Sequence, residues 1–179
     1  MVKGLLIRWL IRKDMPVVLA LESRCFEFPW IEEDFLACLQ QSNCIGMAAV
    51  VQDRILGYMI YELHHDVLHV LNFATDPNYQ RRGVGHALFG ELTDKLTQQR
   101  RNCLRFDCRE TNLEAQLFFK SQGCRCVDVL PQVYGDTNED AYRFEYRIEA
   151  AIAAEIDGHT VADSGAVVVE RTQFGSGKK

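Results

Sequence analysis

The sequence lacks three features that would each indicate a familiar class of protein. It has no uninterrupted apolar run of about 18 residues, the length that a membrane-spanning helix needs, so we predict no membrane span. Lys and Arg number 20 against 25 Asp and Glu, a net charge of −5. This balance argues against a nucleic-acid-coating protein, because phosphate binding draws on a surplus of basic side chains. The seven cysteines contain no CxxC pair, which indicates reduced thiols in a cytoplasmic protein.

The length and the change of composition near the C-terminus predict one domain with a tail. A chain of 179 residues with 47% hydrophobic residues is long enough for one well-buried core. After Glu149 the composition shifts to Ala, Gly, Ser and small polar residues, so residues 1–149 are predicted to form the domain and 150–179 a mobile tail. An edge strand at Gly165–Glu170 is the alternative for the tail.

The hydrophobic pattern predicts an α/β (α+β) protein. Apolar residues at Val84, Leu88, Leu92 and Leu96 recur every fourth position and indicate a helix. Thr111 and Glu114 fit a capping box that begins a later helix. The predicted order is strand 4–11, helices 14–25 and 31–41, an antiparallel meander 45–51, 55–63 and 68–74, helix 83–100, strand 104–108, helix 111–121 ending at Gly123, and strands 124–130 and 141–148.

The stretch from Tyr79 to Leu88 places Gly83-x-Gly85 between a strand and a helix. Free backbone N–H groups and the helix dipole converge on an anion at such a point, and glycine lets a phosphate approach closely. A simple glycine-bearing turn explains the same letters. The dinucleotide fingerprint requires a third glycine where Leu88 stands, and no Gly-Lys-Ser/Thr follows as a nucleotide P-loop requires.

Several motifs together resemble the GNAT acyltransferase superfamily. Gln80-Arg-Arg-Gly-Val-Gly85, preceded by Asp76-Pro77, is similar to its Q/R-x-x-G-x-G/A signature. Phe28-Pro-Trp30 with Phe35, Asn72–Pro77, Arg109–Asn112 and Phe119–Gly123 follow in the order of the ribosomal-protein-alanine N-acetyltransferase branch. The resemblance covers about residues 5–148 and leaves out only the tail.

The resemblance implies a fold and a co-substrate. The fold is a mixed, mostly antiparallel seven-stranded sheet with about four helices, in which strands 4 and 5 splay apart. The co-substrate is acetyl-CoA, with no metal. Main-chain groups from Phe73 to Thr75 would pair with the pantetheine arm, and the amides from Arg81 to Ala87 would hold the diphosphate. The implied cofactor-binding residues are Phe73, Ala74, Thr75, Arg81, Arg82, Gly83, Val84, Gly85, His86, Ala87, Asn112 and Phe119.

The resemblance also implies catalytic positions, with two departures from the family pattern. Asp107 stands at the position of the general base, on a strand face that it shares with Arg105 and Arg109. The alternative for Asp107 is an aspartate simply paired with those flanking arginines. Phe119 stands where the family has a tyrosine that serves as the general acid. Tyr134 is therefore the predicted substitute donor, with an exposed loop aromatic as the alternative.

The implied acceptor is the N-terminal α-amine of a protein or peptide. An α-amine with a pKa of about 8 is roughly one-tenth neutral at pH 7, whereas lysine is under about a thousandth neutral, so α-amines suit a weak base better. Phe28, Trp30, Phe35 and Tyr134 match the region that frames the acceptor, with core packing as the alternative for Trp30 and Phe35. His64, His65 and His69 receive no metal or base role. A small-amine acetyltransferase and a coenzyme-A-binding regulator without turnover are the other functions considered, and the oligomeric state stays open.

Overall fold

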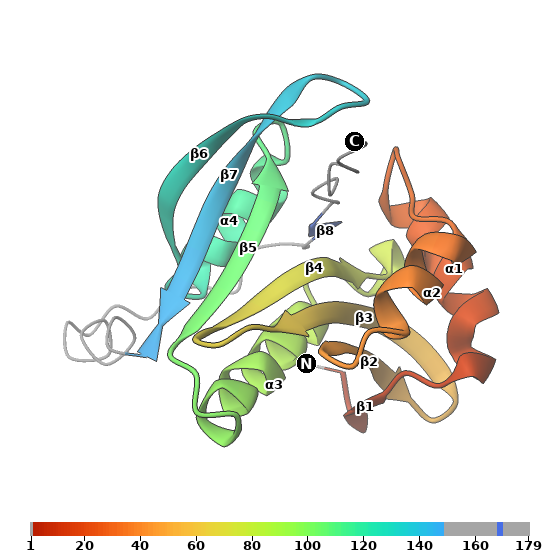
Figure 1. Ribbon diagram of the computed structural model, residues 1–179. Helices are drawn as coiled ribbons and strands as arrows, with labels where there is room; N and C mark the ends of the chain where they lie inside the picture. Colours follow the sequence, from red (N-terminus) through yellow and green to blue (C-terminus); the bar gives the residue numbers. More distant parts are fainter. Residues whose placement is uncertain (1, 149–167, 170–179) are drawn as a thin grey trace.

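The computed structural model describes residues 2–148 and 168–169 (Figure 1). The strands and helices follow in the order that the sequence predicts, with two short 3₁₀ helices in addition. The elements are β1 Leu5–Trp9, η1 Arg12–Asp14, α1 Met15–Cys25, α2 Glu32–Leu39, β2 Cys44–Val51, β3 Arg54–Leu63, β4 Val67–Thr75, η2 Pro77–Tyr79, α3 Val84–Gln98, β5 Cys103–Arg109, α4 Leu113–Ser121, β6 Arg125–Tyr134, β7 Glu139–Arg147 and β8 Val168–Val169.

One mixed sheet carries the fold. Its strand order is β1-β2-β3-β4-β5-β7-β6, and β8 pairs with β4 beside this path. All neighbours along the path are antiparallel except β4 and β5, which are parallel. The predicted fold class is therefore confirmed. Among residues 2–148 and 168–169, no helix combines the length and apolarity needed to cross a bilayer.

The parallel strands β4 and β5 separate after a short ladder. Their register runs from Val67 opposite Cys103 to Val70 opposite Phe106. Both strands then continue, but β5 pairs onward only with β7, and β4 pairs with β3 and with β8 at Phe73 and Ala74. Figure 1 shows the two strands diverging from this point, with β8 between them. The splay that the resemblance implies is thus present.

A β-bulge in β4 lies next to the separation. Tyr61 faces Val70 and Ile60 faces Asn72, so Leu71 is the extra residue. Val70 and Phe73 pack into the core on the α3 side, whereas Leu71 packs into the core on the α1 side. A bulge bends a strand and increases its local twist. The bend in β4 therefore begins where the strand loses its parallel partner.

Two apolar cores cover opposite faces of the sheet. The larger core contains Leu88, Leu92 and Leu96 of α3 and Phe118 and Phe119 of α4. The smaller core lies beneath α1 and α2 and contains Leu21 and Phe35. The α1–α2 layer covers β2 to β4, so the same face of β5 and β7 carries polar side chains instead.

The start and end of α4 test two predictions from the sequence. The predicted capping box at Thr111 is wrong, because the N-cap is Asn112, whose side-chain oxygen accepts a hydrogen bond from the Ala115 N–H at 3.0 Å. The Thr111 hydroxyl instead donates to Glu139. The predicted stop at Gly123 is confirmed, since this residue has φ +84° and follows the helix end.

A buried carboxylate joins the first helix to the centre of the sheet. Glu22 of α1 is 1% exposed. It accepts hydrogen bonds from the Trp30 main-chain N–H at 2.8 Å and the Asn72 amide at 3.1 Å, and from the Tyr58 hydroxyl. These bonds fix the segment after α1 against β3 and β4.

We expect Glu22→Ala to lower the free energy of unfolding by about 3 kcal/mol, because it removes the buried acceptor that three buried donors share. Urea denaturation measures the loss. The matched control is Glu33→Ala, which removes an exposed glutamate of α2 and should change stability by less than about 1 kcal/mol. Equal, small losses in both variants would contradict the structural role of Glu22.

Candidate active site

The glycine loop leads directly into α3. Gly83 is the N-cap residue of that helix and has φ 85°, and Arg81 also has a positive φ of 57°. The Ala87 N–H donates to the Gly83 carbonyl at 3.0 Å and so closes the first turn. Ala87 is therefore a correction to the predicted set of amide donors. The N–H groups of Val84, Gly85 and His86 precede that first intrahelical bond and point out of the helix start, where an anion is favoured.

The two arginines of the loop lie on its exposed surface. Arg81 and Arg82 are both exposed, and the Arg82 guanidinium lies 5.5 Å from the centre of the Tyr79 ring. Arg54 approaches the same ring at 4.9 Å. An exposed cation contributes little to an ionic contact in water. The main-chain N–H groups of the loop are therefore better candidates for an anion site than its two arginines.

The end of β4 contacts the glycine loop. Phe73, Ala74 and Thr75 are all buried. A Cβ added at Gly85 would lie 3.7 Å from the Thr75 hydroxyl oxygen, so this hydroxyl is adjacent to the loop. Within the described residues, the Thr75 hydroxyl is one of two buried side-chain polar atoms without a hydrogen-bond partner. The structure thus brings together the β4 and loop segments predicted to hold acetyl-CoA.

Phe119 and Asn112 occupy structural positions in α4. Phe119 is fully buried, and its ring centre lies 4.3 Å from that of Phe106 and 5.8 Å from that of Phe144. Its side chain is part of an aromatic core, which corrects its expected place among the cofactor-binding residues. Asn112 caps α4 with its side-chain oxygen, which accepts from the Ala115 N–H.

Asp107 is held by side chains from two neighbouring strands. Arg143 of β7 contacts both carboxylate oxygens, Nε to Oδ1 at 2.7 Å and Nη2 to Oδ2 at 2.8 Å. His69 of β4 places Nε2 3.2 Å from Oδ2. Burial raises the pKa of Asp107, but the hydrogen bonds from Arg143 and His69 outweigh burial and lower the pKa to about 2. Asp107 is therefore a weak base.

The partners of Asp107 differ from those expected. Arg105 instead pairs with Glu145 at 2.7 Å, and Arg109 pairs with Asp136 at 2.6 Å. Each of these arginines bridges to the β6–β7 hairpin. The alternative of an aspartate paired with its flanking arginines is wrong in its partners, because cross-strand neighbours on β4 and β7 reach the carboxylate first.

Sequence reasoning assigned no role to His69, which the structure places against Asp107. It alternates with Leu68 and Val70, which enter the α3-side core, so its side chain faces the polar side of the sheet with Asp107. Strand alternation is the signal that could have indicated this face. The parallel register that aligns His69 with Arg105 was the missing information, because no local pattern reveals how two distant parallel strands are aligned.

A cavity of about 420 Å³ lies between the segment that follows α1 and the ends of β5 and β6, and one of its lining residues, Tyr134, contacts Asp107. Phe28, Trp30 and Tyr134, three of the residues predicted to frame the acceptor, line it. Tyr134 is buried, and its hydroxyl donates to the Asp107 carbonyl at 3.4 Å, so the alternative of an exposed loop aromatic is wrong. The full lining is Glu27, Phe28, Pro29, Trp30, Ile31, Arg109, Tyr134 and Asp136.

Phe35 does not line this cavity. Its ring is fully buried in the smaller core, 5.2 Å from Trp30 and 5.8 Å from Tyr58 between ring centres. Phe35 therefore packs against the Trp30 ring inside the core. This corrects the expectation that Phe35 frames the acceptor, and the alternative of core packing holds for it. The Trp30 Nε1 atom is the second buried side-chain polar atom among the described residues that lacks a hydrogen-bond partner.

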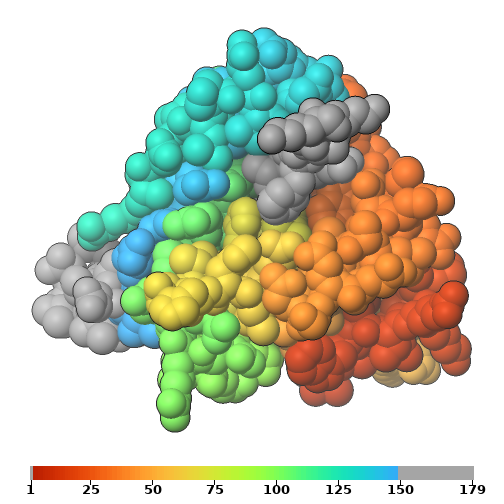
Figure 2. All heavy atoms as spheres, viewed as in Figure 1, coloured from red at the N-terminus to blue at the C-terminus, as the bar shows by residue number. Residues whose placement is uncertain are grey.

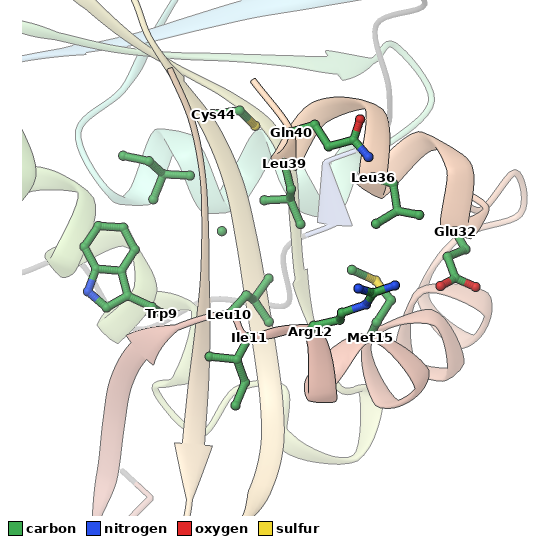
Figure 3. Close-up of a pocket in the computed structure, with 12 residues that line it drawn as sticks. Trp9, Leu10, Ile11, Arg12, Met15, Glu32, Leu36, Leu39, Gln40 and Cys44 are labelled. Carbon is green, nitrogen blue, oxygen red and sulfur yellow. The ribbon is translucent and has the colours of Figure 1, made fainter. Parts of the chain in front are cut away.

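Three parts of the chain meet on one face of the molecule. Figure 2 shows the β6–β7 region, the β4 and β5 strands and the α1–α2 region on that face. A second cavity of about 500 Å³ lies away from these residues, between α1, α2 and the β1–β2 edge (Figure 3). Trp9, Leu36 and Leu39 line this second cavity, and no predicted site residue does so.

Acid titration tests the Asp107 cluster. The pKa of Asp107 falls from 3.8 to about 2 on folding, which corresponds to about 2 kcal/mol of stability. Because the folded pKa is the lower one, this stability is present above pH 3.8 and is lost as the pH falls through about 2.

We therefore expect Asp107→Asn to be less stable than wild type at pH 7 and to lose less stability between pH 5 and 2, by about 2 kcal/mol. Urea denaturation across this pH range measures both. Asp94→Asn, at an exposed position of α3, is the control and should follow the wild-type curve. An Asp107→Asn curve parallel to wild type would contradict the lowered pKa.

A splayed parallel strand pair beside a glycine loop at a helix start defines an acyltransferase of the GNAT type. The sequence model of the acetyltransferase (GNAT) family matches residues 15–124. The chain therefore belongs to the GNAT family. It is an N-acetyltransferase, and acetyl-CoA is its co-substrate.

Known proteins of this family are similar to this one over most of its length. The [ribosomal protein bS18]-alanine N-acetyltransferase of Escherichia coli K12 is 29% identical over 130 residues, 72% of this chain and 87% of the relative. The crystal structure of the Escherichia coli ribosomal-protein-S18-alanine N-acetyltransferase matches with a TM-score of 0.73 at 27% identity, covering 80% of this chain and 94% of that one. The resemblance to this branch is thereby confirmed.

A more distant structure shows the same fold. Arabidopsis thaliana NAA60, crystallised in complex with acetyl-CoA, matches with a TM-score of 0.71 at 18% identity, covering 81% of this chain and 99% of that one. At this identity the likeness shows the fold alone.

Proposed function

We propose that this enzyme transfers the acetyl group to the N-terminal α-amine of a protein or peptide. The observation that carries the proposal is the cavity of Phe28, Trp30 and Tyr134, which the Tyr134 hydroxyl connects to the Asp107 main chain. Its volume of about 420 Å³ lies in the range of pockets that hold small ligands. An end of a peptide chain fits such a pocket, and the Escherichia coli relative is named for an acceptor of this kind.

The acetyl donor is proposed to enter between β4 and β5 from the α3 side. The amides of Val84, Gly85 and His86 bind the diphosphate, and the Thr75 hydroxyl lies next to that loop. The main chain at Phe73 and Ala74 holds the pantetheine arm. Because β8 pairs with these same two residues, the arm has to displace β8 when it binds there.

Asp107 and Tyr134 are proposed to act at the acyl-transfer point. Asp107 lies just past the last paired residues of β4 and β5, where a thioester in the gap would be nearest to the acceptor cavity. The Tyr134 hydroxyl, next to the Asp107 carbonyl, is the proposed donor of a proton to the departing thiolate.

The seven cysteines are free thiols, which supports a cytoplasmic location.

Release of coenzyme A thiol tests the acceptor class. We expect the full chain to release thiol with an alanine-initiated peptide, and not with the same peptide carrying an acetylated N-terminus and an internal lysine. The reason is that an α-amine is about a hundredfold more often neutral at pH 7 than a lysine amine. Spermidine and simple aminoglycosides complete the panel.

Two outcomes would contradict the proposal. Thiol release confined to the small amines would identify a small-amine acetyltransferase. Tight binding of acetyl-CoA without thiol release from any acceptor would identify a coenzyme-A-binding regulator. Both outcomes are read from the same assay together with calorimetric binding of acetyl-CoA.

A substitution at Gly83 tests the diphosphate loop. Gly83 has φ 85°, a conformation that a β-branched side chain resists. We expect Gly83→Val to raise the dissociation constant of acetyl-CoA at least about tenfold, a change of about 1.4 kcal/mol. Isothermal titration calorimetry measures it, and circular dichroism confirms that the variant is folded.

The matched control is Gly90→Ala on the same helix, where an added Cβ meets no atom within 4 Å. This variant should bind acetyl-CoA as the wild type does. Arg82→Ala should weaken binding by less than about fivefold, since an exposed cation contributes at most about 1 kcal/mol. A larger loss in Arg82→Ala than in Gly83→Val would overturn binding by main-chain amides.

A further inference from the structure

His69 lies at the fork between β4 and β5. It is one residue before the last parallel pair, Val70 and Phe106, and Asp107 is one residue after it on the other strand. The contact between His69 and Asp107 therefore spans the point at which the strands part. The His69 side chain is 13% exposed and that of Asp107 only 1%, so of the two, His69 is the one that a ligand reaches.

The surroundings of Asp107 make it a poor proton acceptor. Arg143 engages both of its oxygens, and a protonated Asp107 would lose that bidentate contact. A general base works best when it titrates near the operating pH, and imidazole is the side chain that does so at neutral pH. The chemistry of the cluster therefore assigns the proton to its histidine.

The hydrogen bond to Asp107 also sets the state of the ring. Since the carboxylate accepts, His69 Nε2 carries the hydrogen and donates it to Oδ2 across 3.2 Å. The Nδ1 atom of the neutral ring then has its lone pair available. An aspartate placed in this way holds the tautomer and stabilises the imidazolium that forms, without being protonated itself.

We propose that His69 accepts the proton of the acceptor ammonium group, and that Asp107 and Arg143 are the residues that position it. This proposal rests on the proposed acetyl transfer and assigns its base. It adds a catalytic residue on β4 and changes Asp107 from a base to a positioning residue.

The reaction balances with the groups at hand. His69 Nδ1 takes one proton from R–NH₃⁺, directly or through one water molecule, and the neutral amine attacks the thioester carbonyl. The C–S bond breaks as the C–N bond forms. Tyr134 gives its hydroxyl proton to the coenzyme A thiolate and recovers a proton from the attacking nitrogen, and the imidazolium releases its proton to solvent.

The experiment compares His69→Gln with wild type over pH 5.5 to 9, using thiol release with the peptide acceptor. Glutamine can still donate to Asp107 but cannot take a proton. We expect kcat/KM at pH 7 to fall about a hundredfold, the lower end of general-base contributions. The deficit should shrink above pH 8, because an α-amine with a pKa of about 8 is then neutral without help. A purely structural loss would be constant across this range.

Other charged groups face His69 and have to be separated from it. Glu62 and His64 approach from β3 and the turn after it, Arg105 from β5 and Arg143 from β7. His64→Gln should therefore show the same dependence of kcat/KM on pH as the wild type. His65→Gln is the neutral control, since that side chain is 95% exposed. A changed pH dependence of kcat/KM in His64→Gln, together with a wild-type pH dependence in His69→Gln, would overturn the assignment.

Chemical rescue and chelation complete the test. Added imidazole should restore thiol release to His69→Ala at least about tenfold, since a free base replaces the missing one. Glu62, His64 and His69 place possible ligand atoms within 4.8 Å of one another. Loss of wild-type activity with EDTA and its recovery with Zn²⁺ would show that His69 is a metal ligand and would overturn the proposal.

The inference and the proposed function fail in different ways. Wild-type enzyme without thiol release from any peptide contradicts the proposed function. Wild-type enzyme that turns over while His69→Gln keeps kcat within about twofold and the same pH profile contradicts the role of His69 alone.

Discussion

The separation of β4 from β5 is the constraint on which the rest of this structure depends. Two parallel strands that share a ladder only from Val67 to Val70 leave main-chain donors and acceptors unpaired beyond it. Buried main-chain groups need partners, so the gap requires an occupant with its own hydrogen-bonding groups. Residues Val168 and Val169 pair with β4 at this place. The amide groups of a pantetheine arm have the same capacity, which supports the proposal that acetyl-CoA binds in this gap.

The fork also organises charge on the polar face of the sheet. Three acidic side chains along this face are paired with an arginine from a neighbouring segment: Asp107 with Arg143, Glu145 with Arg105, and Asp136 with Arg109. Buried charges are costly unless they are paired and hydrogen-bonded. These pairs let β5 and β7 carry a charged surface where α1 and α2 give no cover. Of these three pairs, the one between Asp107 and Arg143 also contacts an imidazole, that of His69, at the point where β4 and β5 separate.

The acceptor cavity depends on a separate chain of contacts. Glu22 fixes the Trp30 main chain, Phe35 supports the Trp30 ring, and Arg109 lies between the rings of Phe28 and Tyr134 at 5.0 and 4.1 Å. The proposed donor and acceptor sites thus lie on opposite faces of the sheet. At Asp107, next to the point where β4 and β5 separate, the carboxylate contacts His69 and the carbonyl accepts from Tyr134.

The sequence by itself determined the elements, their order and the family, because helix period, strand alternation and glycine positions are local properties of the chain. It also placed Gly83 at a helix start and put Asp107 on a polar strand face. Only the tertiary structure decided which partners Asp107 has, that Phe119 and Phe35 belong to cores, and that His69 lies beside the fork. The physical reason is register: the alignment of β4 with β5 and of β5 with β7 follows from packing across the whole sheet, and no short stretch of residues encodes it.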